Sequence, residues 1–140
     1  MAVSVDVAVF SHVDEVPHVV LIRRGNEPFQ GAWALPGGFV ELEEDLPLAA
    51  ARELEEETGI VVDPATLTQV GAYGSPGRDP RMRVVDVLYW VSVPEPPRPV
   101  GGSDAAHSQL IPVSEALSSQ FELAFDHPLV LRDAVRAAGL

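Results

Sequence analysis

The chain of 140 residues is long enough for one ordinary core, so we expect residues 1–140 to form a single domain. It carries 21 acidic and 9 basic residues, a formal net charge of -12, which disfavours nucleic acids and anionic membranes as partners. Because there is no Cys, disulfides and thiolate chemistry are excluded, and any metal must bind to oxygen or imidazole. No apolar run is long enough for a bilayer span and no signal peptide is evident, so we expect a cytoplasmic protein.

The first third of the chain predicts two strands and a long loop. Residues 3–9 alternate valine with small or polar residues, and residues 18–22 are mostly β-branched. This pattern predicts two paired strands that are joined around residues 14–15. Residues 24–38 are interrupted by Gly and Pro, so we expect an irregular loop there, with a short extended stretch at residues 33–35. Loops of this length are often functional.

A helix is predicted next, over residues 46–58. Apolar or small residues recur there at helical spacing, while glutamates occupy another stripe. Asp45 is suited to the N-cap, Pro47 to the first turn, and Gly59 to the position that ends a helix.

The second half of the chain repeats the alternation of strands and helices. We expect strands around residues 66–72, 83–93 and 107–113, a Gly- and Arg-rich loop at residues 74–81, a helical turn at residues 113–117, and a last helix that begins at Pro128. Strands and helices interleaved in this way predict an α/β domain with a mixed β-sheet between helices.

Acidic residues are concentrated on and before the first helix. Eight of the 21 acids lie within residues 41–57. On a helix, Glu53, Glu56 and Glu57 stand at i, i+3 and i+4, so three carboxylates share one face and repel one another unless a cation neutralises them. Carboxylate oxygens are suited to Mg²⁺ or Mn²⁺, and Mg²⁺ bound in this way usually completes its coordination with substrate phosphates. The stripe therefore predicts a divalent metal site and a phosphate-containing substrate.

The spacing around this stripe resembles that of a known family. From Gly38 the chain has five residues, Glu44, seven residues, and then the run Arg-Glu-Leu-Glu-Glu-Glu-Thr-Gly-Ile at residues 52–60. This order matches every fixed position of the Nudix box, and residues 21–24 and 33–38 are similar to the usual lead-in of Nudix hydrolases. The resemblance implies a Nudix-type α/β/α sandwich with a mixed β-sheet, and an enzyme that hydrolyses nucleoside diphosphates linked to another moiety.

The same resemblance assigns roles to single residues. It implies that Glu53, Glu56 and Glu57 bind the metal together with the backbone carbonyl of Gly37. Arg52 and Glu44 are expected to pair and to hold the preceding loop against the helix. Gly38 and Gly59 are expected to supply turns that larger side chains disfavour.

The general base is left open among several residues. Glu53 or Glu56 could accept the proton from the attacking water. In some relatives the base comes from a loop before the last strand, where this chain has Asp104 and His107. Asp104, or His107 as a neutral base, is therefore a further candidate for this role, and both are candidates for contact with the substrate, although a single histidine near a strand is more often structural.

A loop beyond the box indicates the substrate. Residues 74–81 read Gly-Ser-Pro-Gly-Arg-Asp-Pro-Arg, which resembles the ADP-ribose pyrophosphatase branch of the family. Arg78 and Arg81 could bind phosphate or ribose oxygens, or they could pair with nearby acids on a surface hairpin. Arg23 and Arg24 adjoin the same cleft, and strand alternation predicts that one points inward and the other outward.

Aromatic residues of the long loop are candidates for stacking on adenine. Phe29 is the stronger of the two, and Trp33 is more readily explained as core. Residues 125–128 also resemble the ADP-ribose branch, but Asp126 or His127 as a cap before Pro128 explains them without a ligand.

We therefore expect a Mg²⁺-dependent pyrophosphatase, with Mn²⁺ as a substitute, that splits ADP-ribose into AMP and ribose 5-phosphate. One alternative is an enzyme for oxidised nucleoside triphosphates or dinucleoside polyphosphates. Another is a non-catalytic ADP-ribose sensor, but such sensors are joined to a DNA-binding domain, for which 140 residues leave no room, and they tend to lose box carboxylates. Relatives of this branch commonly dimerise, so a homodimer is a candidate assembly.

Overall fold

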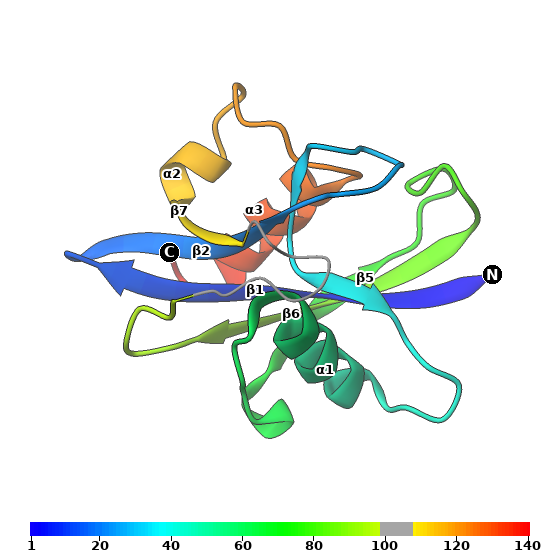
Figure 1. The fold of residues 1–140 in the computed structure, drawn as a ribbon, viewed down its shortest axis with the longest axis horizontal. Helices are drawn as coiled ribbons and strands as arrows, with labels where there is room; N and C mark the ends of the chain where they lie inside the picture. The colour runs from blue at the N-terminus through cyan, green and yellow to red at the C-terminus, as the bar shows by residue number, and fades with distance from the viewer. Residues whose placement is uncertain (99–107) are drawn as a thin grey trace.

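The computed structural model describes residues 1–98 and 108–140. The strands and helices of these residues are arranged in layers. The elements are β1 Ala2–Val13, β2 Val16–Arg23, β3 Trp33–Ala34, β4 Gly37–Phe39, α1 Leu46–Thr58, a 3₁₀ turn Pro64–Thr66, β5 Thr68–Tyr73, β6 Val84–Ser92, β7 Gln109–Pro112, α2 Val113–Ala116 and α3 His127–Ala137. Helix α1 covers one face of the sheet and α3 covers the other (Figure 1). The predicted α/β/α sandwich is confirmed.

The sheet is mixed, as predicted. Its main path runs β3-β2-β1-β6-β5, with β4 paired to β1 and β7 paired to β2. The central pair β1 and β6 is parallel, and β2 and β4 both run antiparallel to β1. The tight turn between β1 and β2 lies at Asp14 and Glu15, which both have positive φ, as hairpin turns require.

The alternation along β1 divides the core into two layers. Val5, Val7 and Val9 face α1, whereas Ala8 and Phe10 face α3, and all five are buried. Side chains of a strand point alternately to its two faces, so Ser4 and Asp6 share the face of Ala8 and Phe10. The α3 side of the sheet therefore changes from apolar to polar toward the start of β1.

Helix α1 has the predicted bounds and the predicted end signals. Asp45 accepts a hydrogen bond from the amide of Leu46 at 2.8 Å, Pro47 lies in the first turn, and Gly59 has φ 76° and donates its amide hydrogen to the carbonyl of Glu55. Ala49, Ala50 and Leu54 are buried against the sheet. The glutamate stripe is therefore carried by a helix that is fixed at both ends and along its apolar face.

Three expectations about local structure were wrong. Residues 37–39 form strand β4 instead of loop, because their backbone pairs with β1. Residues 64–66 form a 3₁₀ turn, capped by Asp63, so β5 begins later than predicted. Asp126 occupies the N-cap position of α3 but makes no capping hydrogen bond, because its carboxylate accepts hydrogen bonds from Arg78.

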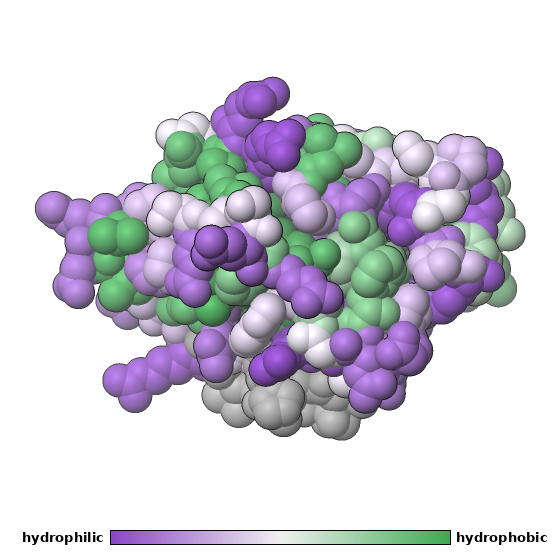
Figure 2. Space-filling model, turned by 90° about the horizontal axis from the view of Figure 1, so that it is seen from above, coloured by the Kyte–Doolittle hydropathy of each residue, from purple (hydrophilic) through white to green (hydrophobic). Residues whose placement is uncertain are grey.

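No helix among residues 1–98 and 108–140 is long and apolar enough to cross a membrane. On the face shown in Figure 2, hydrophobic residues are exposed in patches that hydrophilic side chains interrupt.

Candidate active site

Arg52 and Glu44 hold the loop before α1 against the helix. Arg52 donates from Nε and Nη2 to the two carboxylate oxygens of Glu44, at 2.6 and 2.8 Å, in a bidentate pair. Its Nη2 also donates to the carbonyl of Phe39, at 3.2 Å. The hydrogen bond from Arg52 lowers the pKa of Glu44 to about 2. The arrangement expected from the resemblance is therefore present.

This pair predicts a stability that depends on pH. Because the folded-state pKa of Glu44 lies below its ordinary value of 4.5, the ionised pair stabilises the fold above that value and the gain is lost as pH falls toward about 2. We expect Glu44→Gln to lower the urea midpoint at pH 7, and the difference from the wild type to shrink at pH 3. Glu43→Gln, at an exposed neighbouring position, is the control. An equal deficit at both pH values would contradict the prediction.

The same arginine also contacts two glutamates of the stripe. Its Nη1 donates to Glu53 at 2.9 Å and to Glu56 at 3.2 Å. Glu53 is the more buried, with 14% of its side chain exposed against 57% for Glu56. Loss of solvent around Glu53 raises its pKa, against the opposing effect of Arg52. Arg52 thus supplies the positive charge that the crowded carboxylates require.

Glu57, the third member of the stripe, points toward the β4 strand. One of its oxygens accepts the amide hydrogen of Gly37 at 2.8 Å. A side chain at Gly37 would collide with the carbonyl of Val5, and one at Gly38 would lie 2.5 Å from the carboxylate of Glu53. Gly38 therefore lies within strand β4, close to the Glu53 carboxylate, and does not supply the turn that was expected. Gly59 does adopt the expected left-handed conformation.

These residues fit a divalent metal by the chemistry of their donor atoms. The carboxylates of the stripe and the carbonyl of Gly37 are hard oxygen ligands, which suit Mg²⁺ or Mn²⁺. Within the described part of the chain, no three Asp, Glu or His side chains are grouped closely enough to hold a metal ion. The reason is visible in the contacts, since Glu53 and Glu56 turn toward Arg52 while Glu57 turns toward Gly37.

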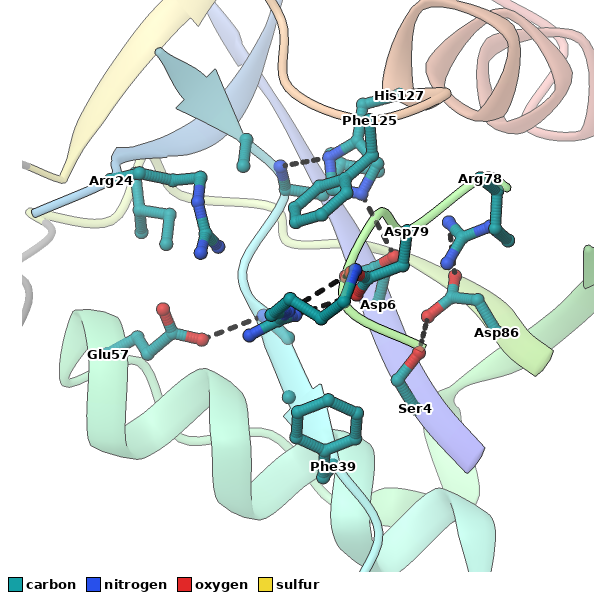
Figure 3. Close-up of a pocket in the computed structure, with 16 residues that line it drawn as sticks. Ser4, Asp6, Arg24, Phe39, Glu57, Arg78, Asp79, Asp86, Phe125 and His127 are labelled. Carbon is teal, nitrogen blue, oxygen red and sulfur yellow. Dashed lines mark hydrogen bonds and ion pairs between the residues drawn. The ribbon is translucent and has the colours of Figure 1, made fainter. Parts of the chain in front are cut away.

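A pocket begins at this strand and extends over the sheet toward α3 (Figure 3). At one side it is bordered by Glu57 and Arg24, and at the other by Ser4 and Asp86. Its lining residues are Ser4, Asp6, Ile22, Arg24, Ala34, Leu35, Gly37, Gly38, Phe39, Glu57, Arg78, Asp79, Arg81, Asp86, Phe125 and His127. Glu57 belongs to both the stripe and the pocket, and the lining residues Gly37 and Gly38 lie against Glu57 and Glu53, so the pocket and the glutamate stripe adjoin.

Arg23, the last residue of β2, and Arg24, which follows it, point in different directions, as strand alternation predicts. Arg24 lines the pocket, and its guanidinium lies 4.9 Å from the ring centroid of Phe125. Arg23 is exposed, donates to the carbonyl of Gly31 at 3.0 Å and lies over Trp33. Arg24 is therefore the one that can meet a ligand in the pocket.

The arginines of the 74–81 loop are held by carboxylates. Arg78 donates two hydrogen bonds to Asp126, at 2.6 and 2.9 Å, and only 5% of its side chain is exposed. Arg81 donates from Nη2 and Nε to Asp79, at 2.7 and 3.0 Å. Both line the pocket. Of the two roles left open by the sequence, the structure shows the second, pairing with nearby acids. Arg78 acts as a brace between the loop and the start of α3.

The aromatic residues are distributed differently from the expectation. Phe29 is outside the pocket lining and packs edge-on against Phe125, with centroids 4.9 Å apart. Trp33 packs on the core beside Phe121. Phe39 and Phe125 line the pocket instead. Asp104 and His107 lie outside the described residues.

Five polar residues of the pocket lining were not among the predicted site residues: Ser4, Asp6, Asp79, Asp86 and His127, the last of which was expected only as a possible helix cap. The available signal was the polar residues at even positions of β1, which break an otherwise apolar strand, and an aspartate inside the apolar run of β6. The strand register brings Ser4 and Asp86 together, because these two residues are paired across the parallel strands β1 and β6.

His127 links this polar group to the loop before β4. Its Nδ1 accepts the amide hydrogen of Leu35 at 3.1 Å, so the ring proton is on Nε2, which lies 3.2 Å from Oδ2 of Asp6. Burial lowers the pKa of His127 to about 4, which agrees with a neutral ring. Burial also raises the pKa of Asp6 and of Asp86. The pKa of Asp86 is raised the more of the two, so near neutral pH Asp86 holds a proton while Asp6 carries the negative charge of the group.

Together these features define a class of protein: an α/β/α sandwich in which a glutamate helix, anchored by an Arg–Glu pair, borders a pocket over a mixed sheet. The NUDIX domain family matches residues 2–134. The chain belongs to the Nudix family.

Two relatives, from two different organisms, agree with this assignment. The chain is 37% identical over 135 residues to the ADP-ribose pyrophosphatase of Methanocaldococcus jannaschii, covering 93% of this chain and 73% of the relative. It is 40% identical over 133 residues to the ADPR responsive transcriptional repressor NtrR of Acinetobacter baylyi, covering 94% of this chain but 52% of the repressor. The chain thus spans about half the length of that repressor.

Solved structures show the same fold. The NUDIX domain of Shewanella oneidensis NrtR, complexed with ADP ribose, aligns with a TM-score of 0.88 at 29% identity, covering 99% of this chain and 88% of that one. A MutT/nudix family protein from Enterococcus faecalis aligns with a TM-score of 0.87 at 28% identity, covering 99% of this chain and 62% of that one.

Proposed function

We propose that the chain is a Mg²⁺-dependent pyrophosphatase, with Mn²⁺ as a substitute, that cleaves ADP-ribose into AMP and ribose 5-phosphate. The observation that carries this proposal is that the glutamate stripe adjoins the pocket at Gly37, Gly38 and Glu57. A diphosphate at this junction would reach the carboxylate face while the rest of the molecule lies in the pocket.

The residues of the stripe would hold the metal. We assign Glu53, Glu56 and Glu57 as ligands, with the carbonyl of Gly37 beside them. A divalent ion held there would supply positive charge to the phosphate oxygens and would lower the pKa of the attacking water.

Other residues would orient the stripe and move the proton. Arg52, held by Glu44, keeps the loop and helix in register and fixes the side chains of the stripe. Glu53 or Glu56 would accept the proton of the attacking water. Arg24, at the border of the pocket nearest to Glu57, would bind a phosphate oxygen of the substrate.

The relatives support ADP-ribose as the substrate. One is named an ADP-ribose pyrophosphatase and another is named for its response to ADPR, and a NUDIX domain of the same fold has been crystallised with ADP ribose. The second relative also favours a different candidate function, in which the domain binds ADP-ribose without cleaving it. All of the box carboxylates are present here, which favours the enzyme.

A substrate panel tests the proposal. We would compare hydrolysis of ADP-ribose, oxidised nucleoside triphosphates and dinucleoside polyphosphates with Mg²⁺, in water enriched in ¹⁸O, and identify the products by mass. We expect ADP-ribose to be cleaved fastest, with the label showing which phosphorus water attacks. A triphosphate that is hydrolysed tenfold faster would overturn the substrate assignment, and tight binding of ADP-ribose without turnover would support the sensor.

A further inference from the structure

His127, the first residue of α3, contacts two other elements of the pocket. Its Nδ1 accepts the amide hydrogen of Leu35 at 3.1 Å, and its Nε2 lies 3.2 Å from Oδ2 of Asp6 (Figure 3). The residue is 3% exposed, and its ring packs beside Phe125, with centroids 5.7 Å apart. Burial and these contacts fix the orientation of the imidazole.

The segment that begins at Leu35 runs directly into Gly37, the residue whose carbonyl we assign to the metal. Gly37 is paired with Asp6 in the register of β4 and β1. The carbonyl of Pro36 accepts the amide hydrogen of Val7 at 2.9 Å, so Pro36 faces β1. Residues that face the partner strand alternate with residues that point away from it. The amide and carbonyl groups of Gly37 therefore point away from β1.

Helices on both faces of the sheet hold this segment. From α1, Glu57 accepts the amide hydrogen of Gly37 at 2.8 Å, and from α3, His127 accepts the amide hydrogen of Leu35. The carboxyl group of Asp6 lies directly against Gly37, because a side chain added to that glycine would collide with Oδ1 of Asp6. His127 therefore reaches Gly37 by two routes, along the backbone from Leu35 and through Asp6.

We propose that His127 is a positioning residue for the metal site: by accepting the amide hydrogen of Leu35, it fixes the direction of the Gly37 carbonyl. This inference rests on the metal ligands assigned under the proposed function. The position requires a hydrogen-bond acceptor, which a neutral imidazole supplies at Nδ1. Groups behind metal ligands orient them, and their loss lowers metal affinity by about 10- to 100-fold. A purely structural role would instead reduce stability and leave the metal affinity of the folded protein unchanged.

Two substitutions of nearly equal shape, His127→Asn and His127→Leu, separate these roles. Both new side chains branch at Cγ and are shorter than the imidazole, but only the amide has an oxygen as many bonds from Cα as Nδ1 is. We would measure the dissociation constant of Mn²⁺ by calorimetry without substrate, the stability of each variant by urea unfolding, and the protection of the Leu35 amide by hydrogen exchange. His12→Asn, at an exposed position of β1, is the control.

A further variant covers the case in which His127→Leu does not fold. His127→Gln keeps an amide but places it one bond farther from Cα, so its oxygen does not coincide with the position of Nδ1. It tests the same contact with Leu35 in a polar side chain.

We expect the Mn²⁺ dissociation constant to rise about tenfold in His127→Leu and His127→Gln, and to stay within about threefold of the wild type in His127→Asn and His12→Asn. The Leu35 amide should be protected in His127→Asn and lose protection in His127→Leu. Equal Mn²⁺ affinity in the asparagine variant and in the leucine or glutamine variant would overturn the inference, whatever stability is lost.

Failure of the proposed function is seen separately. A wild type that binds Mn²⁺ but does not cleave ADP-ribose loses the enzymatic assignment and leaves the role of His127 to be decided by the variants. A wild type that does not bind Mn²⁺ overturns this inference, and the substrate panel then decides on its own whether ADP-ribose is cleaved.

Discussion

Glu56→Gln is expected to lower kcat for ADP-ribose by about 10²- to 10³-fold while the fold is retained. The amide keeps the shape of the side chain but removes a negative charge from the proposed metal site, and a bound metal contributes several kcal/mol to stabilisation of the transition state. The fold should tolerate the change because 57% of the Glu56 side chain is exposed. Steady-state kinetics with Mg²⁺ measures the loss.

Glu55→Gln is the matched control, since this exposed residue lies next to Glu56 but outside the i, i+3, i+4 stripe. We expect its kcat to stay within about twofold of the wild type. Thermal melting gives a second comparison, in which Mg²⁺ should raise the Tm of the wild type and of Glu55→Gln more than that of Glu56→Gln. Near-normal turnover of Glu56→Gln, or an equal Mg²⁺-induced shift in all three proteins, would remove Glu56 from the metal site.

The glutamate helix could be predicted because its determinants are local. Asp45, Pro47 and Gly59 act within one turn of the ends of α1, and the acidic stripe follows from helical periodicity alone. The Arg52–Glu44 pair spans eight residues, and the box fixes both partners. Signals of this range are contained in a short window of sequence, so α1 was predicted with its correct bounds, together with the glutamate stripe that it carries.

The pocket could not be predicted in the same way because its contacts are long-range. Ser4 meets Asp86 across 82 positions and Leu35 meets His127 across 92. Such partners are selected by strand order and register, which alternation of apolar residues does not specify. The same limitation explains Asp126: helix signals near Pro128 suggested a cap, whereas the tertiary fold places a buried arginine beside it.

Arg78→Met is expected to be the most destabilising of the arginine substitutions. Only 5% of the Arg78 side chain is exposed, and its Nη2 lies 2.6 Å from Asp126 and 4.0 Å from Asp86. Removal of Arg78 leaves Asp126 without its partner, at a cost of about 3 kcal/mol, the lower end of the range for buried pairs because 23% of the Asp126 side chain is exposed. For a chain of this length, that loss corresponds to a fall in Tm of about 10 °C, which thermal melting followed by circular dichroism would measure.

Two comparisons isolate the buried charge as the cause. Arg83→Met removes an exposed arginine whose Nη2 donates to the carbonyl of Gly74 at 2.9 Å, and its cost should stay below about 1 kcal/mol. Adding Asp126→Leu to Arg78→Met should restore part of the lost stability, because replacing both members of a buried pair by apolar groups is often neutral. Two results would contradict this role: a Tm of Arg78→Met equal to that of Arg83→Met, or a double variant that is no more stable than Arg78→Met alone. Arg78 would then not be the brace between the 74–81 loop and α3, and binding of substrate phosphate would explain the residue better.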